Sequence, residues 1–269
     1  MSFKSILTVA TRKEDAAALD GAISLARSQD AHLDVLCLGI DHTHSGYYYV
    51  GGMPVAPMVH EEALKEARSD ALEVEEAVRQ RLKAEEIRWA VEGAVAQIGV
   101  VGAHVGQLAR FCDLVVVTRP EGKDTMADSA LVAEAALFDG KVPVLLMPTG
   151  QQKVEGQRIV IGWNQSDAAM SAIRAALPLL KKAAHVDVAI IAPDSHSAER
   201  SDPGGPLSQF LARHGVKAEV SVLARTLPRI SEVLLRHASD VGADMLVIGA
   251  YGHSRLRESI LGGATRDLL

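Results

Sequence analysis

The sequence has little of what marks several protein classes. Only 4% of its 269 residues are aromatic, two are cysteine, and the net charge is −6 at pH 7. Because the lysines and arginines are scattered, no basic patch of the kind that binds nucleic acid is visible, and we expect no nucleic-acid partner. Cys37 and Cys112 lie far apart, with no CxxC and no histidine at ligand spacing. We therefore expect two buried free thiols rather than a metal site or a redox pair.

Long apolar runs are also missing. The short run at residues 6–10 is interrupted by Thr8 and followed by charged residues, unlike a secretion signal or a membrane span. We therefore expect a cytoplasmic protein with no membrane partner. At 48% hydrophobic residues the chain can nevertheless bury a core. Its abundance of Ala, Val, Leu and Gly is typical of the α/β class, in which helices cover both faces of a parallel sheet.

The chain contains two related halves. Residues 31–35 (AHLDV) recur 153 positions later as 184–188 (AHVDV), and residues 113–117 (DLVVV) match 244–248 (DMLVI) at an offset of 131. The second copy is therefore shorter in its middle, mainly because it lacks a Gly-, Tyr- and Pro-rich excursion at 41–57. A polar stretch at 149–157 has linker composition. We predict a duplicated domain, with one copy at 1–150 and the other at 157–269.

Strand-like and helix-like segments alternate within each half. This order implies right-handed crossovers and an open, mostly parallel, Rossmann-like sheet with helices on both faces. Ligands of such sheets bind beyond the carboxyl ends of the strands, where the strand order reverses. In the first half we expect strands at 5–10, 32–40, 87–95, 114–118 and 142–147, and helices at 15–28, 61–84, 101–111 and 130–137. In the second half we expect strands at 158–163, 186–191, 218–223 and 245–248, and helices at 167–181, 206–214 and 228–241, followed by a glycine-rich turn and a last helix.

The glycine-rich turn carries the clearest chemistry. Gly249 and Gly252 follow the last expected strand, and Gly262 and Gly263 come after nine intervening residues. Glycines at a strand-to-helix transition let backbone N–H groups approach an anion, and the start of the helix near Gly262 offers partial positive charge. Phosphate suits such a site. The alternative is that these glycines serve only tight turns and close helix packing.

The spacing Gly-x-x-Gly, nine residues, then Gly resembles the ATP-binding signature of the universal stress protein family. The whole chain resembles a tandem two-domain member of that family. The resemblance implies two five-stranded parallel domains of the adenine nucleotide alpha-hydrolase-like type, with ATP or AMP bound at Gly249, Gly252 and Gly262. The position after the third glycine, usually Ser or Thr, is Gly263 here, and Thr265 lies two residues further on as a substitute hydroxyl.

The resemblance also implies a site residue at the end of the first strand of the second half. Asn164 stands where the family tends to have Asp. It can still hydrogen-bond to a base or ribose, but it lacks the charge that would help to hold a divalent cation such as magnesium. The alternative is that Asn164 or Ser166 caps the helix expected from residue 167.

Four more residues complete the implied site. Ile191 and Ala192, at the end of the second strand, would line the adenine pocket through backbone contacts. His253 and Arg255 lie inside the glycine motif and either reach a phosphate or remain solvated on a helix surface. The ten histidines are dispersed, with no acidic partners that form a recognisable metal triad, so we expect no metal site.

The first half departs further from the motif. Thr118, Arg119, Pro120 and Glu121 stand where the second half has residues 249–252, so the two leading glycines are absent and Glu121 would repel phosphate. Thr11 stands at the family's Asp position. We therefore expect the first half not to bind nucleotide in the same way. Its loop at 46–54, with three of the four tyrosines, is either a recognition surface or packs over the other half.

Three functions remain open. The first is a nucleotide-binding stress or regulatory module without robust catalysis, and the second is a structural or interaction protein with a vestigial motif. The third is a slow ATP hydrolase, for which no general base or water-positioning residue is apparent. No Ser, His and Asp arrangement can be assembled from the spacing alone.

The strand at 142–147 has no counterpart before the sequence ends at Leu269. In the family that this chain resembles, this strand pairs with its equivalent across a dimer or across the two halves. We therefore expect it to pair with a second copy of the chain, giving a homodimer, because a bare apolar edge recruits a partner. The alternative is that the natural chain continues beyond residue 269.

Overall fold

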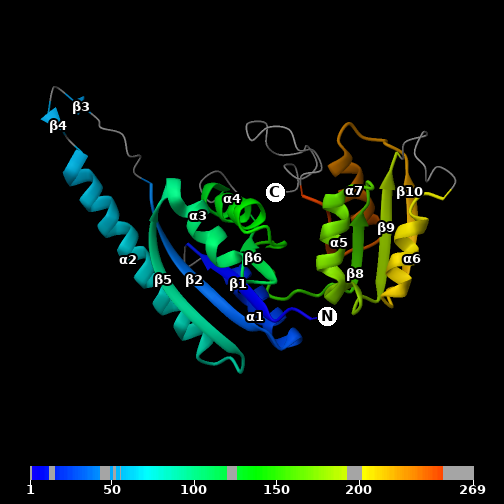
Figure 1. The fold of residues 1–269 in the computed structure, drawn as a ribbon, viewed down its shortest axis with the longest axis horizontal. Helices are drawn as coiled ribbons and strands as arrows, with labels where there is room; N and C mark the ends of the chain where they lie inside the picture. Colours follow the sequence, from blue (N-terminus) through cyan, green and yellow to red (C-terminus); the bar gives the residue numbers. More distant parts are fainter. Residues whose placement is uncertain are drawn as a thin grey trace. The chain divides into compact units, whose positions relative to one another are not determined.

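The computed structural model describes residues 2–11, 16–42, 49–50, 53–54, 56–119, 126–192 and 202–250. The chain divides into two compact units, one spanning Ser2–Val154 and the other beginning at Glu155. The division falls within the polar stretch at 149–157. Each unit is built on a parallel sheet with helices against it (Figure 1), which confirms the α/β class with two tandem domains.

The first unit has a five-stranded sheet in the order β5-β2-β1-β6-β7. All neighbouring strands are parallel. The central strands are apolar on both faces because helices cover both sides, as expected for a buried parallel sheet. The strands are β1 Ser5–Ala10, β2 His32–Asp41, β5 Arg88–Gln97, β6 Leu114–Thr118 and β7 Val144–Met147.

Four helices cover this sheet. On one face α3 and α4, the latter continued by the π-helical turn η1, enclose a core that includes Leu7, Leu36 and Val117. On the other face α2 approaches β2 so closely that a Cβ at Gly39 would lie 1.9 Å from the Ala67 carbonyl oxygen, so only glycine fits there. The helices are α1 Ala16–Gln29, α2 Ala56–Leu82, α3 Ile98–Ala109, α4 Met126–Glu134 and η1 Ala135–Asp139.

The second unit repeats this plan with a sheet in the order β10-β9-β8-β11 among its described residues. One face packs through Ile161 and Val188 against α5 and α6, and the other packs through Val160 and Ala189 against Leu234 of α7. The strands are β8 Arg158–Gly162, β9 His185–Ile191, β10 Ala218–Leu223 and β11 Met245–Val247, and the helices are α5 Asp167–Leu180, α6 Gly205–Arg213 and α7 Ile230–Asp240.

Some expected boundaries were wrong. The long helix begins at Ala56 rather than at residue 61, because Pro57 falls in the first helical turn, where its missing N–H costs no hydrogen bond. The strand expected at 142–147 begins at Val144, and Pro143 contributes only its carbonyl, which accepts from Val115 N at 3.0 Å. The expected Tyr-rich loop contains a short antiparallel pair, β3 Tyr49–Val50 with β4 Met53–Pro54.

The edge strand β5 is engaged by a side chain from α2. Arg79 Nη2 donates to the Val91 carbonyl oxygen at 2.9 Å and pairs with Glu75 at 2.7 Å. Groups that occupy an edge in this way discourage pairing with other chains. Cys37 is fully buried, as expected, but Cys112 is only partly buried, which corrects the expectation for that thiol. Within the described residues, no helix has the length and apolarity to cross a membrane.

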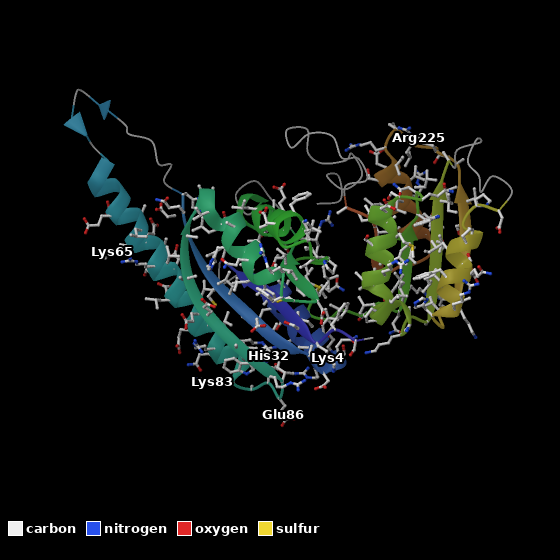
Figure 2. The ribbon with its side chains drawn as sticks, in the orientation of Figure 1. Lys4, His32, Lys65, Lys83, Glu86 and Arg225 are labelled. Carbon is white, nitrogen blue, oxygen red and sulfur yellow. The ribbon has the colours of Figure 1, made fainter. Side chains whose placement is uncertain are left out.

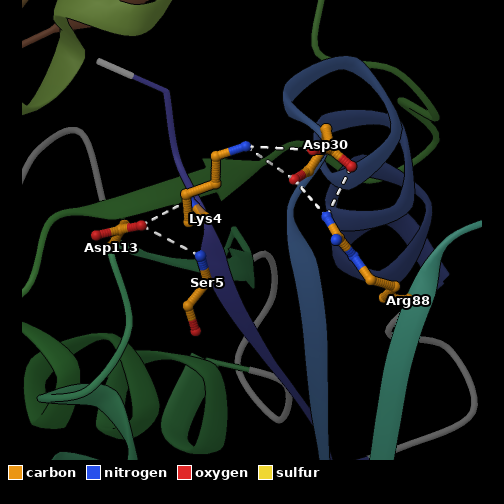
Figure 3. Close-up of polar contacts among 5 residues, drawn as sticks. All are labelled: Lys4, Ser5, Asp30, Arg88 and Asp113. Carbon is orange, nitrogen blue, oxygen red and sulfur yellow. Dashed lines mark hydrogen bonds and ion pairs between the residues drawn. The ribbon is translucent and has the colours of Figure 1, made fainter.

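The amino end of the first sheet carries a network of surface charges. Lys4, His32, Lys83 and Glu86 lie where its strands begin (Figure 2). Asp30 pairs with the Lys4 ammonium at 3.3 Å and with the Arg88 guanidinium at 2.7 Å (Figure 3). These groups are mostly exposed, so each pair contributes at most about 1 kcal/mol.

Candidate functional site

The strand order reverses at one place in each sheet. In the first unit this place lies between β1 and β6, and in the second unit it lies between β8 and β11. Open parallel sheets bind ligands in the crevice at the carboxyl ends of two such strands. In the second unit, Asn164 comes shortly after β8 and Gly249 shortly after β11. The fold thus brings two residues predicted from sequence to adjacent strand ends.

The segment after β8 forms a capped entry into α5. Ser166 Oγ accepts from Ala169 N at 3.1 Å and is the N-cap of the helix. Asn164 Oδ1 accepts from Ser166 N at 3.2 Å and from Ser166 Oγ at 2.7 Å. The capping role therefore belongs to Ser166, with Asn164 supporting it. Asn164 is exposed, and no hydrogen bond within the described residues uses its amide N–H donors.

Gly249 packs directly on the first turn of α5. A Cβ at this position would lie 2.5 Å from Ala169 N and 2.7 Å from the Ala168 carbonyl carbon. Contacts that short cannot form, so glycine is required here for packing, one of the two roles considered for the motif. This packing places the end of β11 beside the amino end of α5, where a helix carries partial positive charge and exposes backbone N–H groups.

Ile191 and Ala192 lie at the same edge of the sheet, at the end of β9. Ala192 has a left-handed backbone, with φ of 45°. Its N–H donates to the Leu223 carbonyl oxygen at 2.8 Å, so this donor belongs to the junction with β10 rather than to a ligand. At this strand end, the backbone carbonyls of Ile191 and Ala192 are therefore the groups that could contact a base.

The remaining predicted site residues lie outside the described residues. These are Gly252, His253, Arg255, Gly262, Gly263 and Thr265. In the part of the chain that the structure describes, no group of three or more His, Cys, Asp or Glu side chains is placed to hold a metal ion.

Trp163 is a feature of this region that sequence reasoning missed. Its backbone N–H donates to the Ala189 carbonyl oxygen at 3.0 Å, and its side chain packs against the core beneath α5. The indole Nε1 is buried and has no hydrogen-bond partner among the described residues. The sequence did contain a signal for this residue, because the chain has only two tryptophans and one of them lies at the end of an expected strand.

A polar cluster lies inside the second unit, under α7. Ser221 Oγ donates to Asp187 Oδ2 at 2.8 Å, and His237 Nε2 lies 3.3 Å from Asp187 Oδ1. The aspartate stands between the serine and the histidine, whereas a hydrolytic triad needs the histidine between the other two. Asp187 is the third residue of β9 and therefore lies away from the strand's carboxyl end. The cluster therefore links β9, β10 and α7 through side-chain contacts, and it does not activate Ser221 as a nucleophile.

Comparisons with known proteins agree with this architecture. The model of the Universal stress protein family matches residues 156–269. Universal stress protein Slr1230 of Synechocystis sp. is 34% identical over 65 residues, which are 24% of this chain and only 22% of that relative's length.

Several solved structures match nearly the whole chain. The crystal structure of a universal stress protein from Archaeoglobus fulgidus superposes with a TM-score of 0.69 at 15% identity, covering 98% of this chain and 93% of that one. A functionally unknown protein from Pseudomonas aeruginosa PAO1 gives a TM-score of 0.59 at 17% identity, over 98% and 87% of the two chains. At these identities the likeness concerns the fold, and it extends to both units.

Proposed function

Since residues 156–269 belong to the universal stress protein family and the whole chain has the fold of a tandem member, we propose that the second unit binds an adenine nucleotide, ATP or AMP. The protein would act as a regulatory or stress-response module without robust catalysis. The observation that carries this proposal is the packing of Gly249 on the first turn of α5. It brings the start of the glycine motif to the positive end of a helix at the place where the strand order reverses.

Each described residue has a role in this proposal. The Asn164 amide donates to ribose or base, and the Ile191 and Ala192 carbonyls face the adenine. Gly249 keeps α5 close, so that N–H groups of its first turn favour phosphate oxygens. Gly252, Gly262, Gly263, His253, Arg255 and Thr265 would complete the phosphate site, and magnesium would have no carboxylate at position 164 to bind it.

Calorimetry with ATP and AMP tests the proposal. We expect one nucleotide per chain and loss of binding in Gly262→Glu, because a carboxylate would repel phosphate. Glu121→Gln in the first half is the matched control and should bind as the unaltered protein does. Two equivalent sites, or unchanged affinity in Gly262→Glu, would refute it. Phosphate release from ATP should be negligible over hours, and a metal-dependent burst that Gly262→Glu abolishes would instead favour a hydrolase.

We also propose that β7 pairs with a second copy, giving a homodimer. Val115 N donates to the Pro143 carbonyl oxygen at 3.0 Å, and Arg119 N donates to the Met147 carbonyl oxygen at 2.8 Å. Residues 143 and 147 therefore direct their carbonyls toward β6. In a parallel ladder alternate residues face the neighbour, so Val144 and Leu146 direct their backbone groups to the other edge. Leu146→Pro removes one outward donor and keeps the bonds to β6. Light scattering should show a dimer for the unaltered chain and a monomer for the variant, and a monomer in both would contradict the pairing.

A further inference from the structure

β10 lies at one edge of the second sheet and carries two exposed valines (Figure 1). Val220 is 39% exposed and Val222 is 55% exposed. Val220 lies on the face that α6 covers, because a Cβ at Gly204, the N-cap of α6, would be 3.5 Å from Val220 Cγ1. Val222, two residues later in the strand, lies on the same face. An edge strand with exposed β-branched side chains is a template for pairing with another chain.

The backbone groups of the same two valines face away from the sheet. Ala192 N donates to the Leu223 carbonyl oxygen at 2.8 Å, so residue 223 directs its backbone groups toward β9. Alternate residues of a parallel ladder face the neighbouring strand, so Val220 and Val222 direct their N–H and C=O groups outward. Within the described part of the chain, no hydrogen bond uses these outward groups. β10 therefore offers unpaired backbone groups and apolar side chains at one edge.

The equivalent edge of the first sheet is protected. β5 and β10 hold the same position in the orders β5-β2-β1-β6 and β10-β9-β8-β11. In the first unit, Arg79 of α2 donates to the Val91 carbonyl oxygen of β5 at 2.9 Å. No side chain among the described residues bonds to the backbone of β10 in this way. The second unit therefore leaves open an edge that the first unit closes.

Charge favours one way of pairing two copies of β10. In an antiparallel pair about a two-fold axis, residues with outward backbone groups lie opposite each other and exchange hydrogen bonds. When Val222 lies opposite Val222 of the second copy, Glu219 lies opposite Arg225, once on each side of the axis. Both side chains are exposed, and Arg225 bonds to the Pro228 carbonyl oxygen. Opposite charges in such positions stabilise paired strands.

The two neighbouring registers lack this match. With Val220 opposite Val222, Lys217 would lie opposite Arg225, and like charges in opposite positions destabilise a strand pair. With Val220 opposite Val220 of the second copy, Glu219 would meet no basic residue. Charge complementarity therefore selects the register centred on Val222.

We propose that β10 is a self-association edge, at which two copies of the chain pair antiparallel about Val222 and join their second-unit sheets. The exposed valines of the two copies then cover one another on the α6 face. The contact involves about six residues a side, against about 20–30 in a standard stable interface, so it forms only at high protein concentration. It is separate from the β7 pairing, because β7 belongs to the first unit, and it needs no bound nucleotide.

Sedimentation from micromolar to millimolar protein concentration tests the edge. We expect the mass of the unaltered chain to grow over this range, and to grow likewise in Leu146→Pro, which lacks the β7 pairing. Val222→Lys should abolish the growth, because two lysines would meet on the axis. Leu235→Lys is the matched control, since it alters a residue of α7 that is 44% exposed, and it should associate as the unaltered chain does.

Three outcomes of this experiment would refute the edge: a constant mass up to millimolar concentration, growth that persists in Val222→Lys, or growth that is lost in Leu146→Pro. The β7 dimer should survive in Val222→Lys, so either pairing can fail without the other. Nucleotide binding should also survive in that variant, which keeps the test independent of the proposed function.

Charge reversal tests the register. Arg225→Glu places two carboxylates opposite each other and should weaken the association by about ten-fold. Adding Glu219→Arg restores opposite charges and should return the affinity to within about two-fold of the original value. A double variant that associates as weakly as Arg225→Glu would contradict the register.

Cysteine cross-linking tests which residue lies on the axis. Opposite residues of a hydrogen-bonded antiparallel pair have Cα atoms about 5.5 Å apart, within the range that a disulfide spans. In a Cys112→Ser background, Val222→Cys should therefore form a disulfide-linked dimer on air oxidation. Val220→Cys is the control, because the two copies of residue 220 lie four residues apart along the ladder. Equal cross-linking of both variants, or none in Val222→Cys, would refute the pairing.

Discussion

Asp113 and Asp244 make the same pair of hydrogen bonds in the two halves of the chain. Asp113 Oδ2 accepts from Lys4 N at 2.6 Å and from Ser5 N at 3.1 Å (Figure 3). Asp244 accepts from Gln157 N at 2.8 Å and from Arg158 N at 3.0 Å. Asp113 directly precedes β6 and Asp244 directly precedes β11, and each carboxylate accepts from amides at the start of the neighbouring strand, β1 or β8. The equivalence shows that the sequence repeat is also a repeat of structure.

Replacing either aspartate should destabilise its unit. Asp244→Ala leaves two amides at the start of β8 without their acceptor, which we expect to cost about 1–2 kcal/mol of unfolding free energy because the site is partly solvated. Asp244→Asn keeps one acceptor oxygen and should lose less. Urea denaturation monitored by Trp163 fluorescence measures this, and equal stability of the three proteins would contradict the role.

Two glycines of α3 should respond oppositely to alanine. A Cβ at Gly106 would lie 2.4 Å from Asp139 Cβ, whereas a Cβ at Gly99 would meet nothing within 4 Å. Gly106→Ala should therefore lose about 1–3 kcal/mol through overpacking against η1. Gly99→Ala should be neutral or gain up to about 1 kcal/mol from helix propensity. Thermal unfolding of the two variants provides the comparison, and similar Tm values would show that η1 moves aside easily.

Gly249→Ala should disturb the second unit through packing rather than through charge. The added methyl group would meet the α5 backbone at 2.5 Å, and we expect a loss of about 1–3 kcal/mol. If the nucleotide site is as proposed, affinity for ATP should fall as α5 moves away. Hydrogen exchange of the first amides of α5 would detect the movement, and unchanged protection would mean that the strand end adapts instead.

The two thiols should differ in reactivity. Burial raises the pKa of the Cys37 thiol to about 12, with a smaller contribution from the Glu75 carboxylate. Burial also raises the pKa of Cys112, which is only partly buried. Because the thiolate is the reactive form, a disulfide reagent at pH 8 should modify Cys112 slowly and Cys37 only after unfolding. Cys112→Ser assigns the reacting group, and rapid native modification of this variant would contradict the prediction.

Glu134, the last residue of α4, should make stability depend on pH. Desolvation by burial raises the pKa of this carboxyl above its ordinary value of 4.5. The unfolded chain therefore loses this proton at a lower pH than the folded chain, and stability falls as pH rises from that value through the higher folded-state pKa. Glu134→Gln should be more stable than the unaltered protein at pH 7, and the gain should shrink below pH 4. Urea midpoints at both pH values test this, and an equal difference at both would exclude the titration.

Local pattern was enough to determine the repeat and much of the sheet. The strands expected at 5–10, 114–118 and 218–223 match β1, β6 and β10 residue for residue. β1 and β6 are buried strands whose continuous apolar segments stand out against polar turns. β10 lies at the sheet edge and shows the alternation of apolar and polar residues that is typical of a partly exposed strand. Helix ends were predicted less well. The sequence pattern assigned Ala56 and Pro57 to a loop, whereas the structure has them in the first turn of α2.

The sequence also placed Gly249 among the candidate site residues, because glycine spacing after a strand is a local feature, and the family resemblance added Asn164. Only the tertiary structure decided that Gly249 packs on the α5 backbone and that Asp187 stands between Ser221 and His237. Each of these depends on which strands become neighbours in the sheet and which helix covers them. That choice is made by long-range packing, which brings together residues whose separation in the sequence carries no periodic signal.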